Sequence, residues 1–157
     1  MPSIRPTQGR QDRGSTLIEL AIVVAVITII VTIAVARLDR AKGSAEGGSA
    51  VGCLRAVAAA QTTARFTYGQ YLPATDLADR GLLDSTFREV PFTRSGYELT
   101  ESGAGDTIAY RAEPMGLEHG ARRYYMRAVD GVIRFSDSGD PADDTSPPLG
   151  SDSRDEE

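Results

Sequence analysis

The feature that most constrains this chain is an apolar run near its N-terminus that contains one acidic residue. From Leu20 to Ala36 there are seventeen residues without a charge, and Leu17 and Ile18 extend the run beyond Glu19. At about 1.5 Å per residue, such a helix reaches across a bilayer core of about 30 Å. Lipid offers the backbone no other hydrogen-bond partner and so enforces a helix despite the many β-branched residues. The sequence predicts a transmembrane helix over residues 15–38.

The flanks of this run suggest its orientation and its fate. Basic residues stand on both sides, so their count alone does not orient the helix. Because the leader is short and the large polar remainder follows, we expect the leader in the cytoplasm and the remainder outside. A secretory signal peptide would have an apolar region of about 7 to 15 residues followed by a small-x-small cleavage site. This run is longer and leads into a charged helical segment, so we expect it to be retained.

The segment after the apolar run continues the helical pattern to about Tyr68. Its apolar residues recur at i, i+3 and i+4 spacing and form one stripe of an amphipathic helix, which needs a cover: Val51, Leu54, Val57, Ala58 and Ala64. Four glycines should soften its first part, because glycine costs about 1 kcal/mol relative to alanine inside a helix: Gly43, Gly47, Gly48 and Gly52.

The cover is expected downstream. The stretch TDLADRGLLDSTF reads as a short helix capped by Thr75, with its apolar residues turned inward (Leu77, Leu82, Leu83 and Phe87). GYELTES and DTIAYRAEP alternate like strands, and YYMRAV and VIRF flank Asp130-Gly131, a strong hairpin signal. The predicted fold class is α+β, with residues 39–135 forming the helix continuation and a small globular domain built on an antiparallel sheet.

The last segment, residues 136–157, has one arginine against eight acidic residues, a net charge of −7, and many Ser, Pro and Gly. Such composition buries little, so the segment is expected to be disordered or loosely attached. Four of its acids could supply oxygen ligands to calcium, although their spacing is not that of an EF-hand and such clusters are usually solvated: Asp137, Asp140, Asp143 and Asp144. No other cofactor or metal is expected.

Catalytic signals are few. His119 is the only histidine and lies in a turn-like stretch, and Cys53 is the only cysteine and lies within the helical pattern. Cys53 reads as a small buried or half-buried residue, with an intersubunit contact as the alternative. No nucleophile–base pair, phosphate loop or zinc spacing is found. The chain is therefore not expected to be an enzyme, and without a basic run it is not expected to bind nucleic acid.

Glu19 still requires an explanation, because an unpaired carboxylate in lipid costs a few kcal/mol. A free α-amine four residues earlier would neutralise it, if the chain were cut between Gly14 and Ser15. The heptapeptide GSTLIEL at residues 14–20, with the apolar run behind it and a short basic leader before it, closely resembles the class III signal of type IV pilins and type II secretion pseudopilins. SAVGCLRAVAAAQTTARFTYGQYLP and YYMRAVDGVIRF also look like the globular part of pilin-like proteins.

This resemblance implies a processing pathway. Residues 1–14 would be a cytoplasmic leader that a membrane-embedded prepilin peptidase removes after Gly14, and Ser15, in place of the usual Phe, would become the N-methylated first residue. Glu19 would meet the amine of a neighbouring subunit and set the axial register. The further partners would be copies of this chain, other pilins, and an inner-membrane assembly platform with a separate cytoplasmic ATPase. The precursor would cross the inner membrane once before entering a periplasmic or extracellular filament.

Three functions remain open from the sequence. The first is a structural subunit of a type IV pilus-like filament. The second is a pseudopilin of a type II secretion system, which a calcium site in the acidic segment would favour. The third is an uncleaved single-pass membrane protein whose periplasmic domain binds a ligand, and this function requires that Gly14 is never cut.

Overall fold

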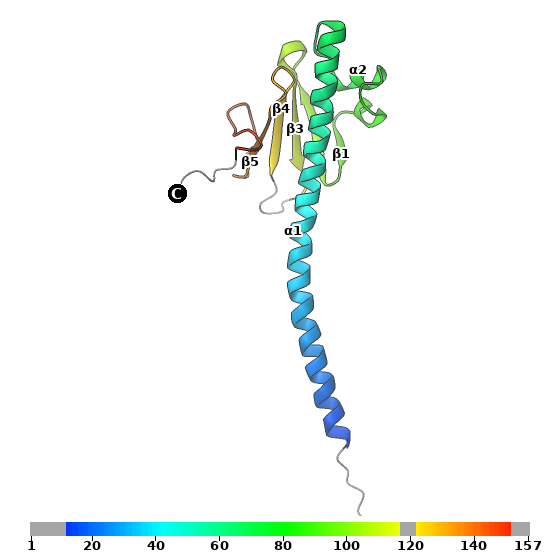
Figure 1. The fold of residues 1–157 in the computed structure, drawn as a ribbon, viewed down its shortest axis with the longest axis vertical. Coiled ribbons are helices and arrows are strands. Elements are labelled where there is room, and N and C mark those ends of the chain that lie inside the picture. Colours follow the sequence, from blue (N-terminus) through cyan, green and yellow to red (C-terminus); the bar gives the residue numbers. More distant parts are fainter. Residues whose placement is uncertain (1–11, 117–121, 152–157) are drawn as a thin grey trace, which may run out of the picture. The chain divides into compact units, whose positions relative to one another are not determined.

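The computed structural model describes residues 12–116 and 122–151. The chain divides into two compact units, which meet between Ala41 and Lys42. Helix α1 (Asp12–Tyr68) contributes its first part to one unit and its second part to the other. The second unit also contains the following elements, which Figure 1 labels in part: α2 (Ala74–Asp79), η1 (Ser85–Arg88), β1 (Phe92–Arg94), β2 (Tyr97–Ser102), η2 (Gly105–Thr107), β3 (Ala109–Pro114), β4 (Arg123–Arg127) and β5 (Ile133–Ser136).

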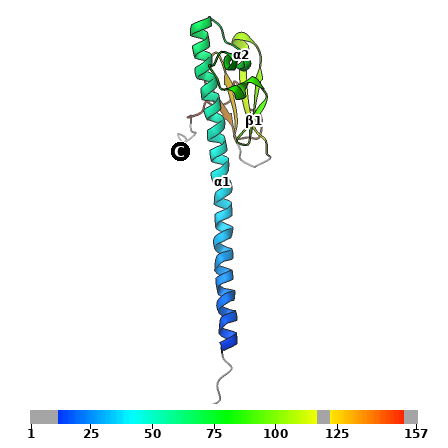
Figure 2. The ribbon, with the colours of Figure 1, turned by 90° about the vertical axis from the view of Figure 1, so that its right-hand side faces the viewer.

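The five strands form one antiparallel sheet in chain order, from β1 to β5. Side chains alternate between its faces: Tyr124 and Met126 of β4 are buried, whereas Tyr125 between them is only half-buried. The second part of α1 lies along the buried face, as the two ribbon views show (Figures 1 and 2). The predicted α+β fold class is confirmed, and β1 is a strand that the sequence analysis did not predict.

The apolar stripe predicted on α1 forms the centre of the core. Leu54 and Val57 are fully buried, in one cluster with Tyr110 and Met126 of the sheet. Each aliphatic side chain buried in this way contributes about 1.5–3 kcal/mol. Ala64 belongs to a smaller cluster that includes Leu72 and Leu77 from the segment after the helix. The stripe is therefore covered on its whole length by the sheet and by α2.

Gly47 lets the sheet approach α1 closely. A Cβ atom on Gly47 would lie 2.9 Å from the Tyr124 hydroxyl oxygen, whereas one on Gly48 would meet nothing within 4 Å. The helix is formed through both residues. At Gly47 the missing side chain is therefore a packing requirement, which offsets the cost of glycine in a helix.

The short helix after the α1 loop differs from its prediction at the N-terminus. Helix α2 begins at Ala74 with Pro73 before it, so Thr75 is not its cap. Instead, the Ala74 N–H donates to the Glu101 carboxylate of β2 at 2.7 Å. A residue distant in sequence thus supplies the acceptor for a free N–H group at the start of the helix. Leu77 and Phe87 are buried as predicted, whereas the remaining two predicted residues, Leu82 and Leu83, are half-buried.

The Asp130-Gly131 hairpin is confirmed with a wider turn than two residues. Met126 pairs with Ile133, and the chain between the strands runs through residues 128–132. Gly131 has φ = 63°, a left-handed conformation that glycine adopts without strain. The Asp130 carboxylate accepts from the Val132 N–H at 3.0 Å, which closes the turn from within.

The expectation of a disordered or loosely attached segment after residue 135 is wrong for residues 136–151. Ala142 is buried, and Leu149 packs against the main core. The Leu149 N–H donates to the Ile133 carbonyl at 2.7 Å, and the Phe135 N–H donates to the Pro147 carbonyl at 3.0 Å. The segment thus supplies backbone hydrogen-bond partners to the outer edge of β5. The amino-acid composition of the segment does not indicate this role. Residues 152–157 lie outside the described residues.

Candidate processing and assembly site

The predicted cleavage residues lie in the first turns of α1. Gly14 and Ser15 follow the helix start at Asp12, and the structure describes their backbone as helical. Leu17 is the first residue of the helix whose side-chain environment is described, and it is exposed. The predicted helix in this region is therefore present, while the roles of Gly14 and Ser15 in cleavage and methylation stay predictions.

The apolar segment behind them is long enough to cross a membrane. Leu17–Val35 spans 19 residues with a mean hydropathy of 2.9, and none of it is buried within the described structure. Apart from Glu19, every residue of this span is apolar or threonine. Because the core of a soluble domain would bury such residues, their exposure fits a membrane span or a helix that packs against other chains.

Two threonines within this segment are satisfied by the helix itself. The Thr28 hydroxyl donates to the Val24 carbonyl at 2.7 Å, and the Thr32 hydroxyl donates to the Thr28 carbonyl at 2.8 Å. A polar group in lipid without a partner is costly, and these back-bonds remove most of that cost. The threonines are thus compatible with a membrane environment.

Glu19 is the one charged residue of the segment. Its side chain is exposed, and it forms no ion pair with any residue that the structure describes. Its neighbours Ile18 and Leu20 are 65% and 60% exposed, so the carboxylate lies on an apolar helix surface. A carboxylate of this kind is costly in lipid unless a cation neutralises it.

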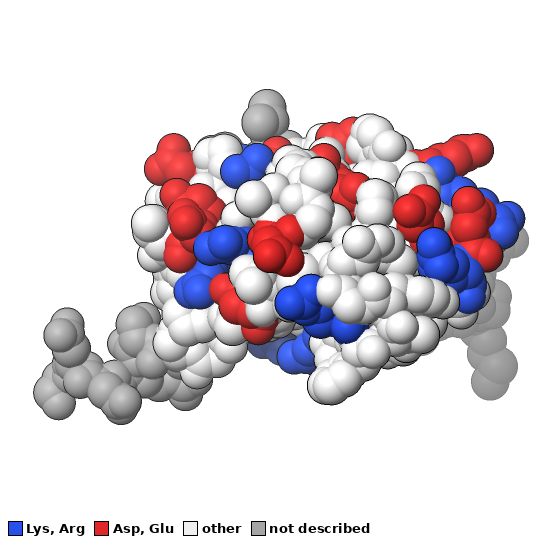
Figure 3. Space-filling view, turned by 90° about the horizontal axis from the view of Figure 1, so that it is seen from above, with Lys and Arg blue, Asp and Glu red and all other residues white. Residues whose placement is uncertain are grey.

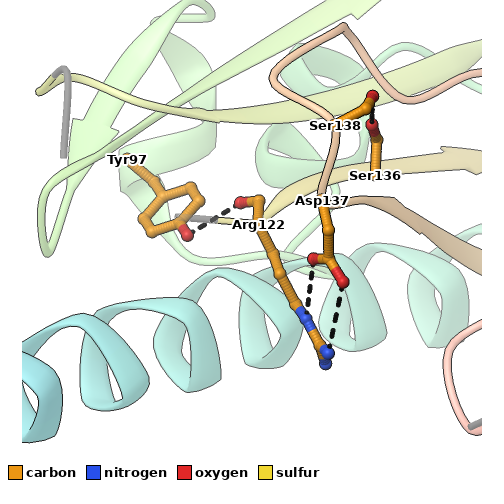
Figure 4. A network of polar contacts seen from close by, with 5 residues as sticks. All are labelled: Tyr97, Arg122, Ser136, Asp137 and Ser138. Carbon is orange, nitrogen blue, oxygen red and sulfur yellow. Dashed lines mark hydrogen bonds and ion pairs between the residues drawn. The ribbon is translucent and has the colours of Figure 1, made fainter. Parts of the chain in front are cut away.

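A second polar site joins β2, the residue before β4 and the segment after β5 (Figure 4). The Tyr97 hydroxyl donates to the Arg122 carbonyl at 2.8 Å, and the Arg122 guanidinium pairs with Asp137 at 2.9 Å. The same guanidinium lies 4.6 Å from the centre of the Phe135 ring. Burial, and then the neighbouring Tyr124 and Glu46, raise the pKa of Tyr97 to about 12. These contacts hold the start of the C-terminal segment against the sheet. The residues that make them do not include a nucleophile–base pair.

The four aspartates predicted as calcium ligands do not form one cluster among the described residues. Asp137 pairs with Arg122, and Asp140 accepts from the Ser138 hydroxyl at 3.2 Å. Asp143 accepts from the Thr145 side chain and backbone and from Ser146, and the Thr145 bonds in particular lower the pKa of Asp143. Asp144 is exposed. Over residues 12–116 and 122–151, no three His, Cys, Asp or Glu residues gather as a metal site.

Cys53 lies beside a hollow of about 350 Å³ between α1 and the η1–β1 segment, lined also by Ser49, Gly52, Ala56, Asp84, Phe87 and Arg94. Burial raises the pKa of the Cys53 thiol, although Arg94 opposes the shift. A raised pKa keeps the thiol protonated and poorly nucleophilic near neutral pH. Cys53 is half-buried, as expected of a helix residue against a core. His119 lies outside the described residues.

Comparison with known proteins identifies the N-terminal segment. A family model described as the prokaryotic N-terminal methylation motif matches residues 9–35. No curated protein matches this chain, and no solved structure does. The matched residues contain Gly14, Ser15 and the whole apolar span Leu17–Val35 with Glu19. The chain thus carries, over residues 9–35, the N-terminal methylation motif that is the signature of type IV pilins and pseudopilins.

Proposed function

We propose that this chain is a structural subunit of a type IV pilus-like filament. The precursor crosses the inner membrane once through Leu17–Val35, with residues 1–14 as its cytoplasmic leader. Prepilin peptidase cuts between Gly14 and Ser15 and methylates the new amine of Ser15. A membrane platform, driven by a separate ATPase, then moves the mature chain into a filament whose centre is a bundle of its apolar helices.

The observation that carries this proposal is the exposed Glu19 on an apolar surface. Cleavage after Gly14 creates a positive charge at Ser15, one helical turn before Glu19. In a filament the Ser15 amine of one subunit meets the Glu19 carboxylate of its neighbour, so two charges that are each costly in lipid neutralise one another. Only one axial stagger brings them together, and Glu19 therefore sets the register.

The rest of the apolar segment supplies contact area but little selectivity. A helix gains little hydrophobic free energy when it leaves lipid for other apolar helices, so packing and polar pairs must choose the partner. Thr28 and Thr32 already bond to their own helix and leave no free donor. The charge pair is thus the main specific element available at this end of the chain.

The first test is mass spectrometry of the protein purified from membranes with and without the prepilin peptidase. We expect an N-terminus at Ser15 that carries one added methyl group and appears only when the peptidase is present. Replacement of Gly14 by a bulky residue should leave the precursor uncut, with Gly43 replaced in the same way as the control. An intact leader in both strains would refute the proposal and favour an uncleaved membrane anchor.

Measurements of surface filaments and of protein secretion distinguish a type IV pilus subunit from a type II secretion pseudopilin. Deletion of the gene should remove surface filaments that contain this chain and leave protein secretion across the outer membrane unchanged. Loss of secretion with no loss of filaments would instead assign the chain to a type II secretion pseudopilus.

A further inference from the structure

Phe66, near the end of α1, is the most exposed large apolar residue among those that the structure describes. It is 88% exposed, whereas the residues of the apolar span Leu17–Val35 reach at most 69%. Phe66 follows the end of that span by 31 positions, so a bilayer that takes up the span leaves this ring outside. Aromatic rings of this kind dominate the energetics of protein cores and interfaces. A protein surface is therefore the partner that fits Phe66.

A hollow of about 350 Å³ lies on the side of the same helix. It is lined by small residues of α1 and by the η1–β1 segment, and we call it the Cys53 hollow: Ser49, Gly52, Cys53, Ala56, Asp84, Phe87 and Arg94. A Cβ atom on Gly52 would meet nothing within 4 Å, so there is open space beside this glycine. Asp84 and Arg94 pair with each other at 3.6 Å, so the charges of the lining neutralise one another. The Cys53 hollow thus suits an uncharged side chain.

Phe66 does not reach the Cys53 hollow of its own chain. Phe66 is thirteen residues after Cys53, which is about 20 Å along the helix at about 1.5 Å per residue. At 3.6 residues per turn, Phe66 also points about 90° away from the mean direction of the α1 residues that line the hollow. The ring and the hollow therefore face different sides of α1 at different heights. A second copy that is shifted by about 20 Å along the helix axis brings its Phe66 level with the hollow.

The α1 surface between the two features is uncharged. From residue 56 to residue 63 the exposed positions are Ala56, Ala59, Thr62 and Thr63. Charged residues are depleted at the centres of protein interfaces, so this surface suits a close contact. Figure 3 looks onto the end of the molecule where α1 finishes, and basic and acidic side chains lie beside one another there. Charge of one sign does not dominate this end, so the fit of apolar surfaces selects the partner.

We propose that Phe66 of one copy inserts into the Cys53 hollow of a neighbouring copy. This contact rests on the proposed function and adds an interface between the second units of two subunits. Two different surfaces meet in it, and a heterologous contact that does not close on itself builds an open helical array. Ser15 and Glu19 are only four residues apart, about 6 Å along a helix. The charge pair and the Phe66 contact therefore join a subunit to different neighbours.

Disulfide cross-linking through Cys53, the single cysteine of the chain, tests the contact directly. The full chain with Phe66→Cys is expressed in place of the parent, and sheared filaments and membranes are each oxidised with copper–phenanthroline. Each copy offers position 66 to one neighbour and Cys53 to another, so we expect a ladder of dimers, trimers and larger oligomers that reductant removes. Glu98→Cys is the matched control, since Glu98 is exposed on β2 between buried residues of the core-facing side. It should give no oligomer larger than a dimer.

Filling the Cys53 hollow tests the same contact without a new cysteine. Gly52→Leu places a side chain in the open space of the hollow and should reduce the filament fraction about tenfold, as loss of a central aromatic contact does. Phe66→Ser should have a similar effect. Gly48→Leu is the control, because a Cβ there also meets nothing within 4 Å and Gly48 does not line the hollow. Near-UV circular dichroism shows whether each variant keeps the fold.

The outcomes separate this contact from the proposed function. If Phe66→Cys gives no ladder in either fraction while the parent chain forms filaments, the contact is overturned and the proposed function stands. Dimers alone, retained when Cys53→Ser is added to Phe66→Cys, would show that two Phe66 residues meet each other and would also overturn it. Equal assembly of Gly52→Leu and Gly48→Leu would do the same. A ladder in membranes, from a chain that never forms filaments, would support the contact and refute the filament.

Discussion

The side-chain amide of Gln61 joins α1 to the Tyr110 hydroxyl of β3, with 2.8 Å between nitrogen and oxygen. The same amide nitrogen donates to the Leu72 carbonyl at 2.6 Å, and its oxygen accepts from the Leu72 N–H at 3.1 Å. Gln61 is fully buried. One side chain therefore fixes the helix, the loop after it and the central strand against one another.

Replacement of Gln61 by leucine should destabilise the second unit by about 2–4 kcal/mol. The change keeps the volume but leaves the buried N–H and carbonyl of Leu72 without partners, and each such group costs about 1–3 kcal/mol. Tyr110→Phe removes one hydroxyl and should cost less, about 1–2 kcal/mol. Urea unfolding followed by near-UV circular dichroism measures both. Equal stability of Gln61→Leu and the parent would show that Leu72 finds other partners.

Adjacent glycines of α1 should respond in opposite directions to alanine. Gly47→Ala places a methyl group against the Tyr124 hydroxyl and should cost about 1–3 kcal/mol, as overpacking does. Gly48→Ala meets open space and should stabilise the helix by about 0.5–1 kcal/mol. Thermal unfolding of the two variants under the same conditions is the measurement. A gain in stability from Gly47→Ala would mean that Tyr124 moves freely.

Stability should fall as the pH rises from 10 towards 12. Burial raises the pKa of Tyr97 to about 12, above its ordinary value of 10.0, and it also raises those of Tyr110 and Tyr124. In this window the unfolded chain releases tyrosine protons that the folded chain keeps, so the free energy of unfolding decreases with pH. Below pH 10 these groups are protonated in both states. Melting temperature against pH measures the effect, and Tyr97→Phe should make the curve less steep between pH 10 and 12.

Local patterns predicted much of the fold. Burial of one helix face requires apolar residues at helical spacing, as around Leu54 and Val57, and burial of one sheet face requires alternating apolar residues, as in β2 to β5. Both patterns can be read from the sequence. Thr75 misled the assignment of a helix cap because Glu101, 27 residues away, supplies the acceptor for Ala74 instead. A long-range contact of this kind leaves no local signal.

The candidate sites also differ in whether a local sequence pattern marks them. Gly14, Ser15 and Glu19 lie within one stretch of six residues, so the sequence marks them as a group. The outer face of the sheet combines residues of several strands, and only the strand register brings Arg111 and Arg134 to either side of Tyr125. The attachment of residues 136–151 was missed because few apolar side chains mark it, and most of its contacts are backbone hydrogen bonds.

Removal of residues 137–157 should destabilise the sheet by about 2–4 kcal/mol. The truncation loses the buried Ala142, the packing of Leu149 and two backbone hydrogen bonds on the edge of β5. Removal of residues 152–157 alone is the control and should leave the melting temperature unchanged. Chelator should also leave it unchanged, because Asp137, Asp140 and Asp143 bond to their own chain. A loss of stability that chelator reproduces would instead establish a structural calcium ion.

Glu19→Ala should leave membrane insertion and cleavage after Gly14 intact and reduce filament assembly at least tenfold. The variant leaves the Ser15 amine of the neighbouring subunit in the apolar bundle without a counter-charge, and an unpaired charge of this kind costs about 3–5 kcal/mol. Glu19→Gln should fail similarly, because the amide is polar but uncharged. Thr28→Val is the control, since the Thr28 hydroxyl bonds only to its own helix at Val24. Immunoblots of sheared filaments against membrane fractions measure assembly for each variant. Normal filaments from Glu19→Ala would show that helix packing alone sets the register.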